Sequence, residues 1–333
     1  MRVLVSGGAG FIGSHFVKRL LRTGDEVAVL DKLTYSGNRA NLPDDVEFHE
    51  GDVAEPEDVA RAARGCAAIV NFAAETHVDR SILQAEAFGR AEFRGTQVLL
   101  EHVRESGARL VQVSTDEVYG DLEAGGSSSE DDPLRPSSPY SAAKAAGDLL
   151  VPAYVRTFGV NASITRGSNT YGPNQYPEKF IPLFVTNALD GEPLPLYGDG
   201  RQVRDWLFVE DHCAGIELVL REGAAGEVYN VGGGDEHENV EVAKRIVELT
   251  GADSSLLRSV PDRPGHDRRY SLATAKLRGL GWAPATGFEE GLRLTVEWYR
   301  DNRAWWEPIK SGEYREYYER QYAERLAGST AVT

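Results

Sequence analysis

The chain of 333 residues places Thr115-Asp116-Glu117 in front of Val118-Tyr119-Gly120 and then supplies Tyr140 and Lys144. This set holds more acid and base groups than one redox step needs, because a Tyr with a Lys four residues later can serve a hydride transfer alone. The additional Asp-Glu pair predicts a second task on the same substrate. Removing water next to a newly formed ketone would need such a pair.

Tyr140 and Lys144 are four residues apart, so on a helix they share one face. A phenol has a pKa near ~10 and is a poor base at neutral pH. A nearby ammonium and an oxidised nicotinamide would both favour the phenolate. We therefore expect Tyr140 to accept a proton from an alcohol. The alternative, an ordinary half-buried aromatic residue, is weakened by the cofactor loop described next.

A glycine-rich segment, Gly8-Ala9-Gly10-Phe11-Ile12-Gly13, follows the first apolar run and opens a helical one. Without side chains the backbone can turn tightly and approach a pyrophosphate, to which the helix N-terminus offers free N–H groups. Asp31 ends the second predicted strand about 20 residues on, where a ribose-binding acid belongs. A carboxylate there accepts hydrogen bonds from a ribose 2′-hydroxyl and repels a 2′-phosphate. The cofactor is therefore predicted to be NAD rather than NADP.

Further cofactor contacts are expected where later strands end. Asp52 and Val53 could meet the adenine edge, although a helix N-cap is an equally good interpretation of Asp52. Small residues after the fourth strand would let the dinucleotide lie close to the backbone. The predicted cofactor-binding residues are Gly7, Gly10, Phe11, Ile12, Gly13, Asp31, Lys32, Thr34, Asp52, Val53, Phe72, Ala73, Ala74, Thr76, Tyr140, Lys144 and Thr170.

Short apolar runs alternate with helical stretches through the first half of the chain. Strands are expected at 3–5, 27–30, 46–48, 68–72 and 110–113, and helices at 14–22, 56–64 and 97–106. Alternating strands and helices predict a Rossmann-type, doubly wound parallel α/β sheet. Such a sheet binds its ligand outside the carboxyl ends of its strands.

The pattern loosens after about Arg166, where prolines become frequent, so a second, smaller mixed α/β lobe for the substrate is expected there. Residues 1–168 are predicted to form the NAD-binding domain, with a return to it around 204–229. Residues 169–203 and 230–327 are predicted to form the substrate lobe. Trp206-Leu207-Phe208-Val209 is expected to be a strand that returns to the first domain.

The formal net charge of −16 argues against non-specific nucleic-acid binding. Any anionic ligand must therefore be held by a local basic cluster. Cys66 and Cys213 are isolated and lack metal-ligand spacing, so no metal site and a reduced, cytoplasmic setting are expected. No signal peptide and no membrane-spanning run are recognised.

Together these residues resemble the extended short-chain dehydrogenase/reductase family over nearly the whole chain. Within it, several motifs resemble those of dTDP-glucose 4,6-dehydratases. They are Thr115-Asp116-Glu117-Val118-Tyr119-Gly120, 74–81 (Ala-Glu-Thr-His-Val-Asp-Arg-Ser), 176–179 (Tyr-Pro-Glu-Lys), 198–206 and 262–270. The resemblance implies oxidation at the sugar C4, elimination of water across C5 and C6, and return of the hydride to C6.

In the implied mechanism, Tyr140 takes the proton of the 4-hydroxyl while Thr115 hydrogen-bonds that oxygen. Glu117 then takes the C5 proton as a carboxylate, and protonated Asp116 donates to the departing 6-hydroxyl. Adjacent carboxyl groups can do this only if their environments differ. The predicted catalytic residues are Thr115, Asp116, Glu117, Tyr140 and Lys144.

The resemblance also implies a dTDP-hexose substrate, with Arg204, Arg263, Lys179 and His266 as the local cations for its diphosphate. The remaining contacts would surround the sugar and the base. The predicted substrate-binding residues are Thr76, Thr115, Asn169, Lys179, Phe180, Pro195, Tyr197, Arg204, Asn230, Arg263, His266 and Tyr270. The helices after Phe88 and after Ser141 resemble those that pair into a four-helix interface, so a homodimer is expected.

The chain departs from the family pattern at two places. Ala91-Glu92 stand where the family often has Thr-Asn, and Thr170 stands where it often has Asn. Two alternatives remain open. A nucleotide-sugar 4-epimerase or a decarboxylase on the same scaffold would need Tyr140 and Lys144 but not Asp116. A non-catalytic NAD-binding regulator commonly loses the Tyr or the Lys, and both stand here.

Overall fold

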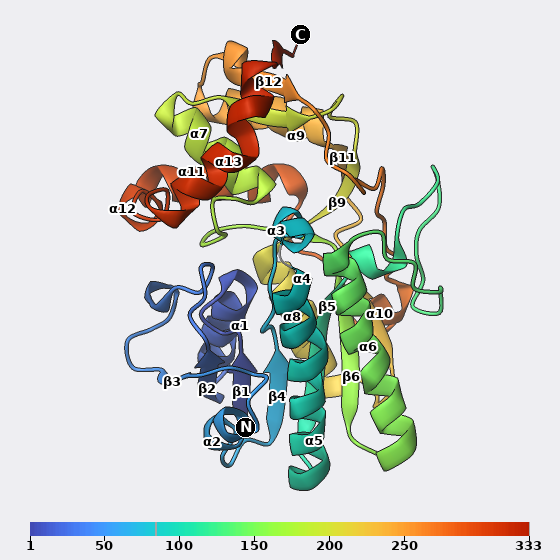
Figure 1. Ribbon diagram of the computed structural model, residues 1–333. Coiled ribbons are helices and arrows are strands. Elements are labelled where there is room, and N and C mark those ends of the chain that lie inside the picture. Colours follow the sequence, from blue (N-terminus) through green and yellow to red (C-terminus); the bar gives the residue numbers. More distant parts are fainter. Residues whose placement is uncertain (84, 333) are drawn as a thin grey trace.

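The structure is a computed structural model that describes residues 1–83 and 85–332, and it forms two lobes (Figure 1). The larger lobe, which contains the N-terminus, is built around a seven-stranded sheet. Its strands are β1 (Arg2–Ser6), β2 (Glu26–Asp31), β3 (Glu47–Glu50), β4 (Ala68–Asn71), β5 (Arg109–Thr115), β6 (Ala162–Gly167) and β10 (Val228–Val231). The predicted Rossmann-type parallel sheet is confirmed, because every neighbouring pair is parallel.

The spatial order of the strands is β10-β6-β5-β4-β1-β2-β3. Strands β2 and β3 are added on one side of β1 and the later strands on the other side, so the direction reverses between β1 and β4. Strand β1 shows why the sequence forms a sheet buried on both faces. Val3, Leu4 and Val5 are all fully buried, with Val3 and Val5 in one core cluster and Leu4 in another. Such an unbroken apolar run is typical of parallel strands. The reversal creates the crevice in which doubly wound sheets bind ligands.

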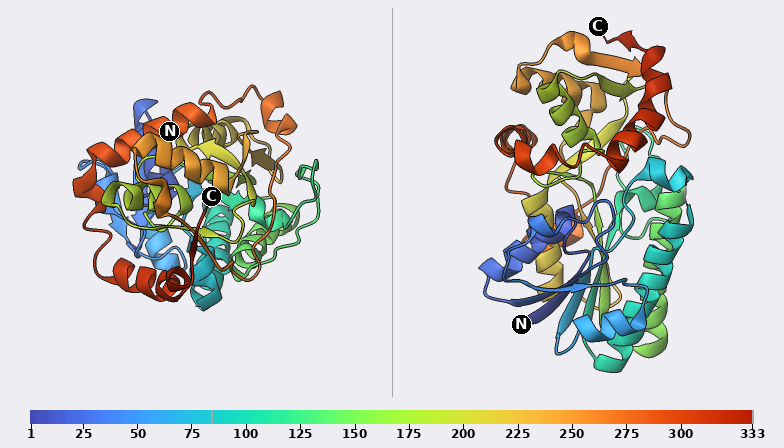
Figure 2. Two further views of the ribbon diagram at one scale, coloured as in Figure 1. Left: turned by 90° about the horizontal axis from the view of Figure 1, so that it is seen from above. Right: turned by 60° about the vertical axis from the view of Figure 1, so that its left-hand side comes forward.

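Helices cover both faces of this sheet, as the right-hand view of Figure 2 shows. One face carries α1 (Phe11–Arg22) and α8 (Val209–Glu222). The other carries α2 (Pro56–Ala62), α5 (Thr96–Ser106) and α6 (Pro139–Phe158). The short helices α3 (Val78–Leu83), α4 (Ala85–Gly89) and α10 (Ala275–Gly279), with the π-helix η2 (Arg90–Gly95), complete this lobe.

Helix α6 positions two predicted catalytic residues, and its start is well defined. Ser138 Oγ accepts the Ser141 N–H at 3.1 Å, while Ser141 Oγ accepts the Ser138 N–H at 3.1 Å. This reciprocal cap, with Pro139 in the first turn, is a strong helix-start signal. Tyr140 therefore lies in the first turn of the helix and Lys144 one turn later.

The smaller lobe lies over the carboxyl ends of the main sheet, in the upper part of Figure 1. Its two three-stranded sheets contain β7 (Asn169–Tyr171), β9 (Val203–Phe208) and β11 (Glu236–Glu238), and β8 (Leu194–Tyr197), β12 (Leu257–Val260) and β13 (Thr330–Ala331). Its helices are α7 (Phe180–Asp190), α9 (Asn239–Thr250), α11 (Phe288–Asp301), α12 (Arg303–Trp306) and α13 (Glu313–Ala327). An aromatic-rich core of its own holds this lobe together.

The strand expected around Trp206 exists as β9, but it does not return to the main sheet. It pairs in a small sheet with β7, where Asn169 lies opposite Trp206, and with β11, where Glu236 lies opposite Asp205. The chain returns afterwards, through α8 and then β10, which pairs with β6. The chain therefore passes from the small lobe back to the large lobe between Phe208 and Val209, where β9 ends and α8 begins.

Candidate active site

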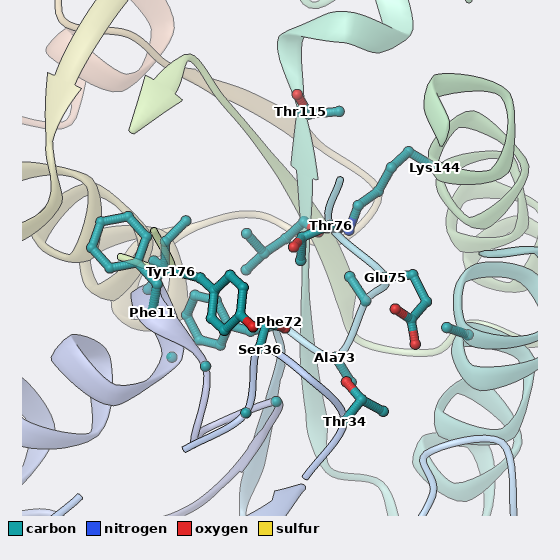
Figure 3. Close-up of a pocket in the computed structure, with 18 of the residues that line it drawn as sticks. Phe11, Thr34, Ser36, Phe72, Ala73, Glu75, Thr76, Thr115, Lys144 and Tyr176 are labelled. Carbon is teal, nitrogen blue, oxygen red and sulfur yellow. Dashed lines mark hydrogen bonds between the residues drawn. The ribbon is translucent and has the colours of Figure 1, made fainter. Parts of the chain in front are cut away.

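A cleft of about 340 Å³ lies at the carboxyl end of the main sheet. All seventeen predicted cofactor-binding residues line it, as do all five predicted catalytic residues. Figure 3 shows Thr115 at the end of its strand and Lys144 extending from a helix into the same space. The loop after β4 supplies Phe72, Ala73 and Thr76. One connected cleft thus joins residues that lie far apart in the sequence.

The glycine loop between β1 and α1 packs too tightly against neighbouring backbone to carry side chains. Gly7 has φ +71°, and a Cβ atom there would lie 2.5 Å from the Ala73 nitrogen. A Cβ on Gly13 would collide with the Gly7 carbonyl oxygen. The cap residue of α1, Gly10, offers no side-chain hydrogen bond to the first turn. The N–H groups of that turn therefore remain available to an anion such as a pyrophosphate, so the loop fits a dinucleotide.

Asp31 ends β2 at the rim of this cleft and is nearly buried. Its carboxylate accepts the Leu33 N–H at 2.8 Å and the Ala9 N–H at 2.9 Å, which ties it to the glycine loop. Burial raises the pKa of Asp31, and the two backbone N–H groups oppose that rise. Nearby, Asp52 Oδ1 accepts the Ala54 N–H at 2.9 Å, but the N-cap of α2 is Glu55. Asp52 therefore shapes the turn before the helix rather than capping it.

Strand β5 ends at Thr115, and a short 3₁₀ helix, η3 (Asp116–Tyr119), follows at once. Thr115 Oγ1 donates to Asp116 Oδ1 at 3.1 Å and accepts the Glu117 N–H at 3.3 Å. The threonine thus fixes both carboxyl residues at the strand end. Asp116 is 3% exposed, and its Oδ2 has no hydrogen-bond partner among the described residues.

The two adjacent carboxyl groups have different surroundings. Burial, with the negative charges of Glu117 and Asp205, raises the pKa of Asp116 well above its ordinary value. Burial also raises the pKa of Glu117, but Arg263, Arg204 and Lys179 oppose the rise there. Asp116 thus favours its protonated form, and Glu117 is placed to carry a negative charge. This is the asymmetry that an acid and a base on one strand end require.

Tyr140 and Lys144 occupy successive turns of α6, but their electrostatics differ from expectation. Burial, followed by the charges of Glu117 and Glu92, raises the pKa of Tyr140 well above its ordinary value. The Lys144 ammonium lies 3.0 Å from Glu92 Oε1 and 3.4 Å from the Val113 carbonyl oxygen. The carboxylate next to the ammonium was not anticipated, and it offsets the positive charge expected to favour the phenolate.

A second cavity of about 170 Å³ continues from the cleft into the small lobe. Glu117, Asn169 and Lys179 line both spaces, so the two are neighbours. Thr76 and Thr115, also predicted to bind substrate, line the first. The other predicted substrate residues in the second cavity are Phe180, Pro195, Tyr197, Arg204, Arg263, His266 and Tyr270.

Arg204 and Arg263 supply permanent positive charge to the second cavity. Arg204 donates to the Asp267 carbonyl at 2.9 Å, and its guanidinium lies 4.5 Å from the centre of the Tyr270 ring. Arg263 Nε lies 3.6 Å from Asp79 Oδ1. Lys179 also lines this cavity, and His266, the fourth expected cation, is uncharged in this structure. Burial and the neighbouring Arg263 lower its pKa to about 4, so its ring is neutral near pH 7.

Asn230 lines neither cavity, and its expected contact with the nucleotide is wrong in this structure. It is fully buried on β10. Its side-chain amide donates to the carbonyls of Ser128 at 2.9 Å and Ala273 at 3.2 Å, while its oxygen accepts the Tyr119 hydroxyl at 2.8 Å. These bonds occupy the whole amide, which therefore anchors the polar loop before α6.

Several cavity residues were missed by sequence reasoning. Glu75, Tyr176 and His212 line the cleft, and Asp79 lines the second cavity. Asp79 accepts the Tyr197 hydroxyl at 3.0 Å as well as facing Arg263. Its position inside the motif at 74–81 was a signal that could have identified it. For His212, buried in α8, the sequence offered no comparable signal.

His212 also gives a context to Thr170, one of the two departures from the family pattern. The Thr170 hydroxyl lies 3.1 Å from the Ser168 carbonyl and 2.7 Å from His212 Nδ1. A hydroxyl that donates to the carbonyl must accept from the imidazole, which places the ring proton on Nδ1. Burial lowers the pKa of His212 to about 4, so the ring is neutral.

Over residues 1–83 and 85–332, no three His, Cys, Asp or Glu side chains are grouped so that they could hold a metal ion. Within the same ranges, no helix is both long enough and apolar enough to cross a membrane.

The parallel sheet, the glycine loop and the Tyr140–Lys144 pair define an extended short-chain dehydrogenase/reductase. The family model described as GDP-mannose 4,6 dehydratase matches residues 4–295. A dTDP-glucose 4,6-dehydratase of Streptomyces niveus is 54% identical over 324 residues, covering 93% of this chain and 96% of that protein. The chain belongs to the family of dTDP-glucose 4,6-dehydratases.

Solved structures agree with this assignment. The dTDP-glucose 4,6-dehydratase DesIV of Streptomyces venezuelae, solved with NAD bound, superposes with a TM-score of 0.90 at 54% identity and covers 93% of this chain and 100% of its own. A UDP-glucose 4-epimerase of Thermus thermophilus in complex with NAD reaches 0.86 at 37% identity, covering 91% and 100%. The fold is therefore shared with epimerases, and the residues of the site must distinguish the two activities.

Proposed function

We propose that this protein dehydrates dTDP-glucose to dTDP-4-keto-6-deoxyglucose with NAD as a catalytic cofactor. The observation that carries the proposal is the contrast between Asp116 and Glu117 at the end of β5. One is buried in a setting that favours its protonated form, and the other faces three cations. An epimerase needs no such acid and base beside the Tyr–Lys pair, so the contrast favours dehydration.

The cofactor would be held by the loop of Gly7, Gly10 and Gly13 and by Asp31, because these residues leave backbone N–H groups and a carboxylate facing the cleft. When bound, NAD supplies the oxidation at C4 by taking a hydride and the reduction at C6 by returning it. The electrons therefore balance within one turnover, and the overall reaction is the loss of one water molecule.

The residues of the chain supply the proton transfers. Tyr140 takes the proton of the 4-hydroxyl. The Thr115 hydroxyl, which donates to Asp116 in this structure, turns to donate a hydrogen bond to that oxygen. The ketone acidifies C5, from which Glu117 takes a proton while Asp116 donates its proton to the leaving 6-hydroxyl. Water leaves, and C5 later regains a proton from Glu117. Glu117 is then back in its starting state. The proton that Tyr140 took from the 4-hydroxyl passes through solvent to Asp116, which restores the other two groups for the next turnover.

The diphosphate of the substrate would bind in the second cavity. Arg204, Arg263 and Lys179 place positive charge there, in a chain whose formal net charge is −16. An arginine can clamp a phosphate through two parallel hydrogen bonds. Tyr197 and Pro195 also line this cavity and would contact the pyrimidine base. The choice of thymine rests on the relatives.

We also propose a homodimer that pairs α5 and α6 of two copies. Phe93, Leu149 and Phe158 are 44%, 62% and 49% exposed, and all lie on the segment from η2 to α6. A second copy packed against these helices would cover the three side chains. The cytoplasmic location expected from the isolated cysteines stays a prediction.

Purified protein incubated with dTDP-glucose tests the proposal. We expect a product lighter by one water, with no net accumulation of reduced nicotinamide. A product of unchanged mass, such as an epimer, would point to the epimerase alternative, and binding without turnover would point to the regulator. Parallel reactions with UDP-glucose and GDP-mannose determine the nucleotide preference.

A further inference from the structure

Glu92 is a buried carboxylate next to the catalytic lysine. It lies in the π-helix η2, its residue is fully buried, and its Oε1 is 3.0 Å from Lys144 Nζ. Among residues 1–83 and 85–332, Lys144 is the only basic side chain within ion-pair distance of this carboxylate. A buried charge is stable only when it is paired. The two side chains therefore depend on each other.

The elements packed against Glu92 explain why no other cation serves it. Helix α6 contributes Lys144 and Asp148, but Asp148 is itself paired with Arg166 at 2.8 Å. The loop after β4 contributes Glu75, a further negative charge. Helix α5 contributes Thr96, whose hydroxyl has no hydrogen-bond partner among the described residues. Lys144 is the only positive group among them that faces Glu92 and is not already engaged by another carboxylate.

The family pattern often has a neutral Asn at this position, where this chain has a carboxylate. It also acts on Tyr140, one turn before Lys144 on the same helix. Burial raises the pKa of the Tyr140 phenol most, and the charges of Glu117 and then Glu92 raise it further. Burial raises the pKa of Glu92 itself, and the Lys144 ammonium opposes that rise, so the ion pair favours the carboxylate form. In that form Glu92 opposes the effect that the lysine ammonium would have alone on Tyr140.

We propose that Glu92 is a positioning residue that fixes Lys144 and neutralises its charge beside Tyr140. Tyr140 then keeps its proton to a higher pH than it would next to an unpaired lysine. This inference rests on the proposed dehydratase function, in which Tyr140 takes the proton of the 4-hydroxyl. It adds an ion pair to the acid/base set that the resemblance did not supply.

The pH dependence of the first oxidation step tests the electrostatic part. The variants are made in a Glu117→Gln background, in which we expect the reaction to stop after oxidation because the C5 proton is not removed. The rate at which reduced nicotinamide appears in the first turnover then reports proton transfer to Tyr140. Glu92→Gln keeps the shape of the side chain and removes its charge. We expect it to shift the acid limb of the pH–rate profile about one pH unit lower, because the Tyr140 phenol then loses its proton more easily. Glu92→Asp should retain the limb of the parent, because it retains the charge.

Glu101→Gln is the matched control, since Glu101 lies on α5 outside both cavities and accepts the Tyr154 hydroxyl. It should leave the limb in place. An acid limb that does not move in Glu92→Gln, or that moves equally in Glu101→Gln, would overturn the proposal.

Thermal unfolding of a double-mutant cycle tests the ion pair without using activity. With Lys144 present, Glu92→Gln should lower the melting temperature, because a buried ammonium loses its counter-charge. In the Lys144→Met background, the same substitution should raise it, because Glu92 alone is an unpaired buried charge. Equal changes in both backgrounds would show that the two side chains are not coupled, and the proposal would fail. Because this cycle needs no substrate, it stands apart from the turnover assay that tests the dehydratase function.

Discussion

Asp116 and Glu117 are adjacent in the chain, and small differences in their surroundings separate their roles. Asp116 is buried in the cleft wall near other carboxyl groups, whereas Glu117 lines both cavities and lies near Arg204, Arg263 and Lys179. Thr115 holds both through its hydroxyl. The acid and the base are therefore distinguished by the groups around them, which come from both lobes.

Asp116→Asn should slow dehydration by roughly 10²- to 10⁴-fold, because the amide cannot protonate the leaving hydroxyl. Oxidation at C4 should continue, so reduced nicotinamide should accumulate while the water-loss product does not. Stopped-flow absorbance combined with product mass measures both steps. The control is Asp131→Asn, in the exposed loop before α6. Normal water loss in Asp116→Asn would remove Asp116 from the mechanism.

Arg204→Ala should raise the KM for dTDP-glucose roughly 10- to 100-fold, as expected for a lost charge-assisted hydrogen bond. The content of bound NAD should remain normal, because Arg204 lines only the second cavity. Steady-state kinetics measure the KM, and extraction of the cofactor measures the content of bound NAD. Arg201→Ala, three residues earlier and exposed, serves as the control. An unchanged KM would place the diphosphate elsewhere.

At the scale of elements, helix α8 contacts the cleft through a histidine that is neutral when folded. Burial lowers the pKa of His212 from 6.5 to about 4. Above pH 6.5 the ring is neutral in both states, so it has no effect on stability. Between the two values only the unfolded chain binds the proton, and stability falls as the pH falls. The expected loss is on the order of 3 kcal/mol.

His212→Gln should therefore flatten the decline in unfolding free energy between pH 6.5 and about 4. The glutamine side chain can still hydrogen-bond to Thr170 and does not titrate. Urea unfolding at several pH values measures the slope. His237→Gln, at a ring that is 28% exposed, is the comparison that should retain the parent slope. Parallel pH profiles for His212→Gln and the parent would contradict the prediction.

The elements themselves were largely predictable, because their causes are local. An apolar run such as Val3-Leu4-Val5 and the glycine loop after it contain the whole signal for strand, turn and helix. The strand at Trp206 was also recognised, but its sheet was not. Pairing of β9 with β7 and β11 depends on partners that are distant in the chain, and the strand alone does not identify them.

The same distinction holds for the site. The residues that line the cofactor cleft follow the carboxyl ends of successive strands, so their common location follows from the topology. The topology does not predict which residues contact Lys144 and Asn230. Glu92 is brought to Lys144 by the packing of η2 on α6, and Asn230 is occupied by a loop about a hundred residues earlier. Such contacts depend on tertiary packing, for which a single sequence carries little signal.

At the scale of the whole molecule, the exposed apolar side chains on α6 predict how copies associate. Leu149→Arg should shift the protein from dimer to monomer, because a buried charge at the interface costs more than the contact it replaces. Sedimentation velocity measures the change. Leu294→Arg, on α11 of the other lobe, is the control, at 36% exposure. A dimer that survives Leu149→Arg, or a parent protein that is already monomeric, would contradict the four-helix interface.

Glu117, Asn169 and Lys179 line both the cofactor cleft and the substrate cavity, and this shared boundary has a consequence for inhibitor design. A single molecule that filled both spaces would pass close to a carboxylate and an ammonium. A charged linker would be repelled by one of them, whereas an uncharged linker such as an amide could donate to Glu117 and accept from Lys179. A compound of that form could be selective for enzymes that keep an acid at this strand end, and would bind poorly to relatives that lack it.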